Sequence, residues 1–203
     1  MPPRPRDNPP LVPPLLKERV SASTHTNGGE RSVSSRVERL YRAHAPRIWR
    51  LLRRFGVSET DAADLCQEVF VVALRKLPEF EGRSSEMTWL YGIAWRVASQ
   101  HRRKMHRRAE IPVANPTERL STPPEQEDRA DLGRRLAVAY RLLEELEEKQ
   151  RAVFVLYEIE GLPMKQVVEV LGCPLQTGYT RLHAARRRFE EAARRWRREE
   201  GTS

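Results

Sequence analysis

The sequence contains little cysteine and no long apolar segment, and both shortages exclude whole classes of protein. Its two cysteines, Cys66 and Cys173, stand far apart without a CxxC pair, so neither a zinc site nor a disulfide scaffold is expected. Each is expected to be a small buried apolar residue. No apolar run approaches the ~18 residues that cross a bilayer, which excludes direct membrane insertion. The N-terminus lacks the apolar core of an export signal, so we expect a cytoplasmic protein.

Motifs for catalysis are also lacking. The sequence has no nucleophile elbow, no phosphate-binding glycine loop, no metal-ligand spacing and no pair of carboxylates in a plausible cleft. Its five histidines are scattered along the chain. We therefore expect neither an enzyme nor a site for a metal or a cofactor.

Arginine, by contrast, is abundant. The chain of 203 residues has 37 lysine and arginine residues against 28 acidic ones, for a net charge of +9, and 32 of the basic residues are arginine. A planar guanidinium binds phosphate and guanine through paired hydrogen bonds. The composition therefore favours a partner such as nucleic acid or an acidic membrane surface.

Helical periodicity divides the chain into two small domains, and strand-like alternation is absent, so the predicted class is all-α. Residues 1–34, rich in proline and polar residues, are predicted to be a disordered extension. A first helical domain is predicted over 35–108 and a second over 131–198, with a short tail at 199–203. Residues 109–130 hold four prolines and five acidic residues against two basic ones, which predicts a flexible acidic linker.

Local signals place the helices of the first domain. Pro46 is expected to kink the first helix or to start a new one, and Gly56 to end it. Ser58 is expected to cap the second helix, with Asp61 three residues later. A polar loop over 79–88 is expected before the third helix. The predicted inner stripe of the second helix is Ala62, Leu65, Cys66, Val69, Phe70, Ala73 and Leu77.

The second domain ends in the pattern of a helix-turn-helix. A short helix begins near Pro163, a tight turn follows at Gly172 and Pro174, and a longer basic helix runs from about residue 176 to 198. The predicted inner positions of this last helix are Gly178, Leu182, Ala185, Phe189 and Ala192. The positions predicted to face DNA are Gln176, Thr177, Tyr179, Thr180, Arg181, His183, Arg186 and Arg187. The alternative is an ordinary bundle helix with a solvated basic face.

Gly178 is unusual on that inner face, where an aliphatic side chain would pack better. Either the helix begins later, near Tyr179, or two backbones approach closely and Val168 fills the space.

Aromatic and basic residues alternate between residues 83 and 104 in a pattern that suits unstacked bases. Every base offers a face for stacking, and cations pair with the phosphates. The alternative is that Trp89 and Tyr91 belong to the core and that the basic run is a solvated face. The candidate residues are Arg83, Ser84, Ser85, Met87, Trp89, Tyr91, Trp95, Arg96, Gln100, Arg103 and Lys104.

The helix predicted over 59–76 has a second, mixed face. Exposed valines beside acidic residues suggest a protein-binding surface, although a merely solvated face is the alternative. The candidate residues are Asp64, Gln67, Glu68, Val71 and Arg75.

Together, residues 36–195 resemble bacterial sigma factors of the extracytoplasmic-function group. "DAADLCQEVFVVALRKLPEF" resembles the helix that binds the clamp of core RNA polymerase. "MTWLYGIAWRVASQHRRK" resembles the segment that melts the minus-ten promoter element. "KQRAVFVLYEIEGLPMKQVVEVLGCPLQTGYTRLHAARRRF" resembles the helix-turn-helix that reads the minus-thirty-five element.

The resemblance implies a non-catalytic sigma factor that directs promoter recognition and melting for transcription initiation. Its implied partners are core RNA polymerase, promoter DNA in double-stranded and melted form, and an anti-sigma factor. The mixed face, the aromatic and basic segment and the last helix would then contact polymerase, minus-ten DNA and minus-thirty-five DNA respectively. The sequence departs from the family at Arg96, where asparagine is usual, and at Gln100, where aspartate is usual.

A stand-alone helix-turn-helix regulator is the alternative function. It would bind duplex DNA through the second domain alone, and the first domain would serve as a sensor or dimerisation module.

Overall fold

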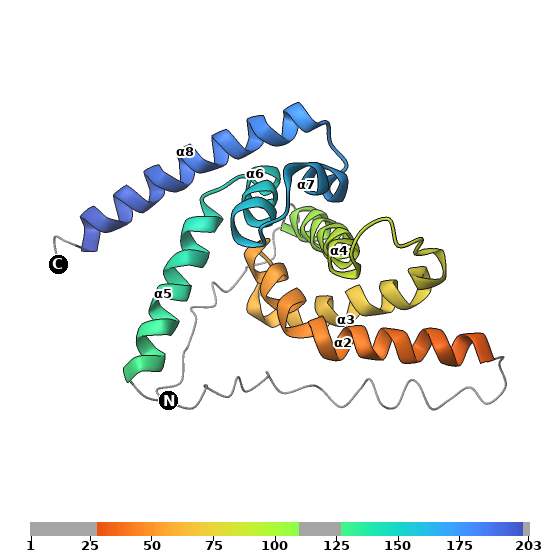
Figure 1. The fold of residues 1–203 in the computed structure, drawn as a ribbon. Helices are drawn as coiled ribbons and strands as arrows, with labels where there is room; N and C mark the ends of the chain where they lie inside the picture. The colour runs from red at the N-terminus through yellow and green to blue at the C-terminus, as the bar shows by residue number, and fades with distance from the viewer. Residues whose placement is uncertain (1–27, 110–126, 201–203) are drawn as a thin grey trace, which may run out of the picture.

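Helices account for most of the two segments that the computed structural model describes, residues 28–109 and 127–200 (Figure 1). The first segment forms α2 (Gly28–Arg54), α3 (Glu59–Lys76) and α4 (Glu86–Ala109), with a short 3-10 turn at Leu77–Glu79. The second forms α5 (Glu127–Glu144), α6 (Glu148–Phe154), α7 (Met164–Leu171) and α8 (Leu175–Glu200), with a π-helical turn at Val155–Ile159. Neither segment contains a strand, which confirms the all-α prediction.

The first domain, residues 28–109, packs α2, α3 and α4 against one another around an apolar core. Each helix contributes a stripe of apolar residues spaced three or four apart, which places them on one face. The inner stripe predicted for α3 is confirmed, since Ala62, Leu65, Cys66, Val69, Phe70, Ala73 and Leu77 are all buried. Ser58 caps α3 as predicted, because its Oγ accepts a hydrogen bond of 3.1 Å from the backbone N–H of Asp61.

Two helices of this domain begin earlier than the sequence suggested. α2 begins at Gly28, so residues 28–34 are helical and the disorder predicted over 1–34 is wrong for them; residues 1–27 lie outside the described part. Val33 packs against the core and extends the apolar stripe of Val37 by one turn, which favours this early start. α4 begins at Glu86, within the loop predicted over 79–88, because Ser85 Oγ accepts a hydrogen bond of 3.0 Å from the N–H of Thr88.

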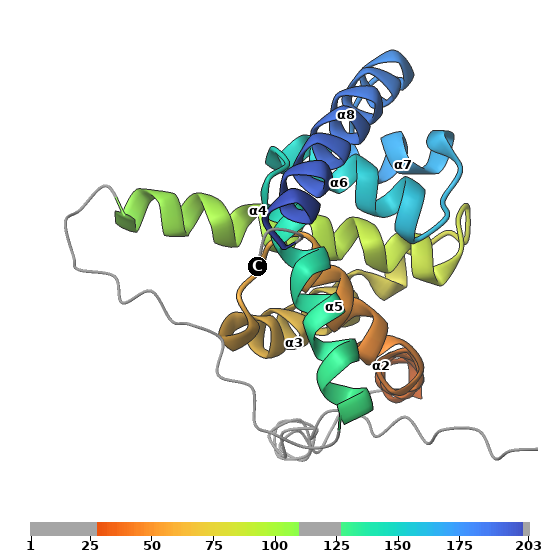
Figure 2. The ribbon, with the colours of Figure 1, turned by 90° about the vertical axis from the view of Figure 1, so that its left-hand side faces the viewer.

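Pro46 lies inside α2 and does not divide it into two helices. Figures 1 and 2 show that α2 changes direction about midway along its length, as expected for a proline that cannot donate to the helical ladder. The predicted kink is therefore present, and the alternative of a new helix is wrong.

The second domain, residues 127–200, contains the predicted helix-turn-helix as α7, a turn and α8. α5 begins at Glu127, so residues 127–130 of the predicted linker are helical; all four prolines of that stretch lie before them. Residues 110–126 lie outside the described part. Gly172 ends α7 with φ 63°, a left-handed conformation that favours glycine. α8 then begins at Leu175, so the later start near Tyr179 is wrong.

The inner face of α8 is the one that the sequence predicted. Gly178, Leu182, Ala185 and Ala192 are buried, and Phe189 is half-buried with its ring stacked on Phe154, 4.9 Å between centroids. A Cβ atom on Gly178 would lie 2.5 Å from Val168 Cγ1 and 2.9 Å from Met164 Sδ. Val168 therefore fills the space that glycine leaves, which confirms the close approach of α7 and α8.

The first prediction concerns this contact. Gly178→Val should lower the free energy of unfolding by about 1–3 kcal/mol, because the added carbons overlap Val168 in a helix pair that has no room for them. The measurement is the thermal midpoint, followed by circular dichroism, where a fall of several degrees is expected.

A matched pair of variants isolates the steric cause. Gly178→Ala combined with Val168→Ala should melt above Gly178→Ala alone, because the shortened Val168 leaves space for the new methyl group. A Gly178→Val protein that melts above the unchanged chain would contradict this account.

Candidate polymerase and nucleic-acid interfaces

The outer face of α3 is open to solvent and mixes charge with apolar surface. Asp64, Glu68, Val71 and Arg75 are exposed, and Gln67 is half-buried. Leu74, which the sequence analysis missed, is 40% exposed beside Val71 at 39%. The spacing of three residues between them was the available signal, since it places both on one helical face. This face therefore combines two exposed apolar side chains with charged ones.

The predicted minus-ten residues are spread over the turn before α4 and the length of that helix. Arg83 is exposed and pairs with Glu81 at 3.0 Å, Ser84 and Met87 are half-buried, and Ser85 caps α4. Towards the C-terminal end, Arg96, Gln100, Arg103 and Lys104 are all exposed. Figure 2 shows this basic end of α4 projecting beyond the other helices.

The three aromatic residues of α4 have different environments. Trp89 is half-buried and its ring lies 5.0 Å from that of Phe80, centroid to centroid. Trp95 is half-buried against the edge of Phe55. Tyr91 is only 1% exposed, so it is a core residue in this arrangement of the chain. The interpretation as core residues therefore describes Tyr91, whereas both tryptophans keep part of their surface free.

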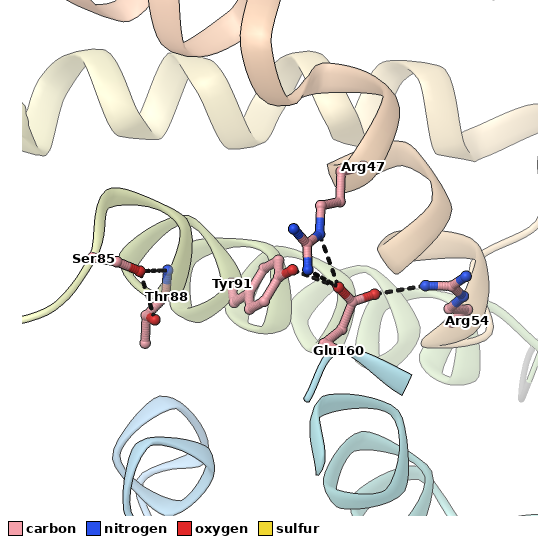
Figure 3. Close-up of polar contacts among 6 residues, drawn as sticks. All are labelled: Arg47, Arg54, Ser85, Thr88, Tyr91 and Glu160. Carbon is pink, nitrogen blue, oxygen red and sulfur yellow. Dashed lines mark hydrogen bonds and ion pairs between the residues drawn. The ribbon is translucent and has the colours of Figure 1, made fainter. Parts of the chain in front are cut away.

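Tyr91 contacts the second domain through its hydroxyl. Its hydroxyl donates a hydrogen bond of 2.5 Å to Glu160 Oε2, just beyond the π-helical turn (Figure 3). Arg47 Nε and Arg54 Nη1, both on α2, donate to the same carboxylate at 3.0 and 2.6 Å. Burial, together with the hydrogen bond to Glu160, raises the pKa of Tyr91, so the hydroxyl stays protonated as a donor.

A second polar group joins α4 to α6. Ser99 Oγ donates to Glu148 Oε1 at 3.0 Å, and the guanidinium of Arg102 lies 3.0 Å from the same carboxylate. Arg102 also donates to the backbone carbonyl of Phe55. Burial lowers the pKa of Arg102. Burial also lowers the pKa of Arg151, and the nearby positive charge of Arg102 lowers it further.

The predicted DNA-facing residues of α8 are accessible, but they are not equivalent. Gln176, Tyr179, Thr180, His183, Arg186 and Arg187 are exposed, and Thr177 and Arg181 are half-buried. Arg186 donates from Nε to Glu158 Oε1 at 2.7 Å, so its charge already has a partner. Arg187 makes no hydrogen bond or ion pair with the residues that the structure describes, which leaves its guanidinium available.

Residues from both predicted DNA surfaces meet in one cleft of about 450 Å³ between α4 and the helix-turn-helix. Trp95, Arg96, Gln100 and Arg103 line one wall, and Lys149, Cys173 and Arg181 line the other. Cys173 is half-buried, so the expectation of a buried residue is wrong for it; it lies in the exposed turn between α7 and α8. Cys66 is buried as expected.

Two family models match the chain. The model described as Sigma-70 region 2 matches residues 40–108, and that described as Sigma-70, region 4 matches residues 136–189. The chain is 31% identical over 154 residues to the RNA polymerase sigma-H factor of Pseudomonas aeruginosa, which covers 72% of this chain and 80% of that protein. It is 30% identical over 151 residues to the ECF RNA polymerase sigma-E factor of Haemophilus influenzae, and the match covers 69% of this chain and 78% of that protein.

The chain belongs to the ECF sigma factors. Region 2 of this sigma factor therefore includes most of α2, with α3 and most of α4, and region 4 runs from within α5 into α8. The fold agrees with that of the sigma factor RpoE from Bartonella quintana, solved in complex with the anti-sigma factor NepR. The TM-score is 0.62 at 19% identity, covering 77% of this chain and 96% of that one.

As a sigma factor, the chain directs transcription initiation, and its family is one of non-catalytic initiation factors. In residues 28–109 and 127–200, no helix is long and apolar enough to cross a membrane. No group of three or more metal-binding side chains comes together in the same residues.

The second prediction concerns the two thiols of this sigma factor. Burial raises the pKa of Cys66 to about 12, so at pH 8 only about one thiol in 10,000 is the reactive thiolate. An Ellman titration of the native protein should therefore detect one rapidly reacting cysteine, Cys173, and two after denaturation. Cys173→Ser should abolish the rapid reaction, and a second rapid thiol in the native protein would contradict the burial of Cys66.

Proposed function

We propose that this sigma factor uses three separate surfaces at a promoter. The outer face of α3 binds the clamp of core RNA polymerase, the turn before α4 and α4 itself bind the melted minus-ten strand, and the outward face of α8 reads the minus-thirty-five duplex. The observation that carries this assignment is that two domains each present a cationic helix, while α3 presents an open mixed face.

The chemistry of each surface supports its proposed partner. Exposed Val71 and Leu74 among acidic residues offer apolar area with charge complementarity to a basic protein groove. The half-buried faces of Trp89 and Trp95 offer stacking surfaces beside the cations of α4. Arg187 and the polar residues at the start of α8 match the roles of phosphate and base-edge contacts in a helix-turn-helix.

Control by an anti-sigma factor is also part of the proposal. The RpoE structure of similar fold was solved with an anti-sigma factor bound. We expect this chain to have a comparable inhibitory partner and to act in the cytoplasm, where polymerase and promoter DNA are found. A stand-alone regulator is not favoured, because the two family models cover both domains of the chain.

Run-off transcription with reconstituted core polymerase tests the proposed function. The purified chain should confer promoter-dependent transcripts on core polymerase with genomic DNA as template. Correctly folded chain that yields no promoter-dependent transcript would contradict the function.

Leu74→Ser should reduce the apparent affinity for polymerase without lowering the thermal midpoint, because Leu74 is exposed. Arg50→Ala, an exposed change outside the three surfaces, is the control.

The third prediction separates the two neighbouring arginines of α8. Arg187→Ala should weaken binding to promoter DNA by the holoenzyme and reduce the slope of log affinity against log salt by about one, since one phosphate contact is lost. Arg186→Ala should change the slope less, because Arg186 is already paired with Glu158. Equal slopes for the unchanged chain and Arg187→Ala would remove Arg187 from the phosphate contacts.

A further inference from the structure

The carboxylate of Glu160 lies between the two domains. Its side chain is only 2% exposed. It accepts hydrogen bonds from Arg47, Arg54 and Tyr91, at 3.0, 2.6 and 2.5 Å, and Figure 3 shows these three donors converging on it. Among the described residues, every partner of this carboxylate belongs to the first domain.

A carboxylate with these partners can be buried only while the first domain is in contact with it. An ionised group removed from water needs paired charges and hydrogen bonds to compensate for its lost hydration. Glu160 obtains these from α2 and α4 alone, so it can be buried only while the second domain is docked. When the domains separate, the carboxylate, both guanidiniums and the Tyr91 hydroxyl can all return to water.

Other polar contacts also cross the interface, beside an apolar core that is continuous between the two domains. Thr88 Oγ1 donates to Gln166 Oε1 at 3.3 Å, Arg53 lies 5.1 Å from the centre of the Tyr140 ring, and Glu148 receives Ser99 and Arg102. Arg102 and Arg151, by contrast, lie close enough for their like charges to disfavour one another. Polar contacts of this kind can be exchanged for water when two domains of one chain separate.

The docked arrangement is incompatible with binding both promoter elements at once. Minus-ten and minus-thirty-five elements are about 25 base pairs apart, which is about 85 Å of duplex at a rise of ~3.4 Å. In the docked form, Arg96 and Arg103 of the minus-ten set line the same cleft of about 450 Å³ as Arg181 of the minus-thirty-five set. Tyr91 is covered as well, whereas the outer face of α3 stays exposed.

We propose that Glu160 is a latch that holds this sigma factor in a closed form unable to engage a promoter. Release of the carboxylate from Arg47, Arg54 and Tyr91 lets the helix-turn-helix domain leave α4 and uncovers the minus-ten segment. The latch itself follows from the contacts in the structure, and the consequence for promoter binding rests on the proposed function. The exposed face of α3 makes polymerase binding possible before the latch opens.

The test measures domain separation directly. Spin labels at Ala63→Cys on α3 and Glu191→Cys on α8, in a Cys173→Ser background, report the distance between the domains in the full chain by pulsed electron paramagnetic resonance. Glu160→Gln keeps the size of the side chain and removes its charge, and it should raise the ratio of open to closed chains on the order of tenfold or more. Arg54→Gln removes a positive charge from the other side of the ion pair and should act in the same direction.

Glu158→Gln is the matched control. It lies two residues away and pairs with Arg186 of its own domain, so it should leave the distance distribution unchanged. Circular dichroism must show helix content as in the unchanged chain for each variant. A Glu160→Gln chain that is folded and keeps the closed distance would overturn the latch, as would equal opening by Glu158→Gln.

A second measurement separates the latch from the proposed function. Binding of a fluorescent single strand carrying a minus-ten element should strengthen severalfold in Glu160→Gln, because the cleft lined by Trp95, Arg96 and Arg103 opens. If the domains open but binding does not strengthen, the latch proposal stands and the assignment of α4 to the minus-ten strand is contradicted. Promoter-dependent transcription by a variant that never opens would instead support the function and refute the latch.

Discussion

A buried carboxylate must be paired, and in this protein that constraint sets how the two domains meet. Glu160 stands at the end of the π-helical turn, and all of its donors come from α2 and α4. The apolar core alone would not select this orientation, since hydrophobic contact is not directional. Three hydrogen bonds with fixed geometry do select it, and they accompany the packing of α7 against α4, the helix proposed to bind the minus-ten strand.

Much of the fold within each domain follows from local sequence. The stripe from Ala62 to Leu77 could be predicted because helical spacing alone decides which residues of α3 share a face. Gly178 was informative for the same reason: a glycine on an inner face requires a large neighbour, and Val168 supplies it. The cap at Ser58 was equally visible, since it involves residues only three apart.

The arrangement between domains could not be predicted from such signals. Glu160 lies 113, 106 and 69 residues from Arg47, Arg54 and Tyr91, and no periodicity in one helix reports a partner so distant. The same limit applies to the site residues. Arg186 and Arg187 look alike in sequence, and only the fold shows that Glu158 pairs with the first. Likewise, Tyr91 and Trp95 belong to one aromatic pattern, but Tyr91 is 1% exposed whereas Trp95 is only half-buried.

At the π-helical turn, two acidic residues that are two positions apart pair with different domains. Glu158, inside the turn, pairs with Arg186 on α8, and Glu160, just after the turn, pairs with residues of the first domain. A π turn accommodates more residues per revolution than an α turn, so it shifts the angular register of everything that follows. The pairing of this short segment therefore depends on its length as well as on its composition: deletion of a single residue would rotate one acidic group away from its partner even if both acidic side chains were retained.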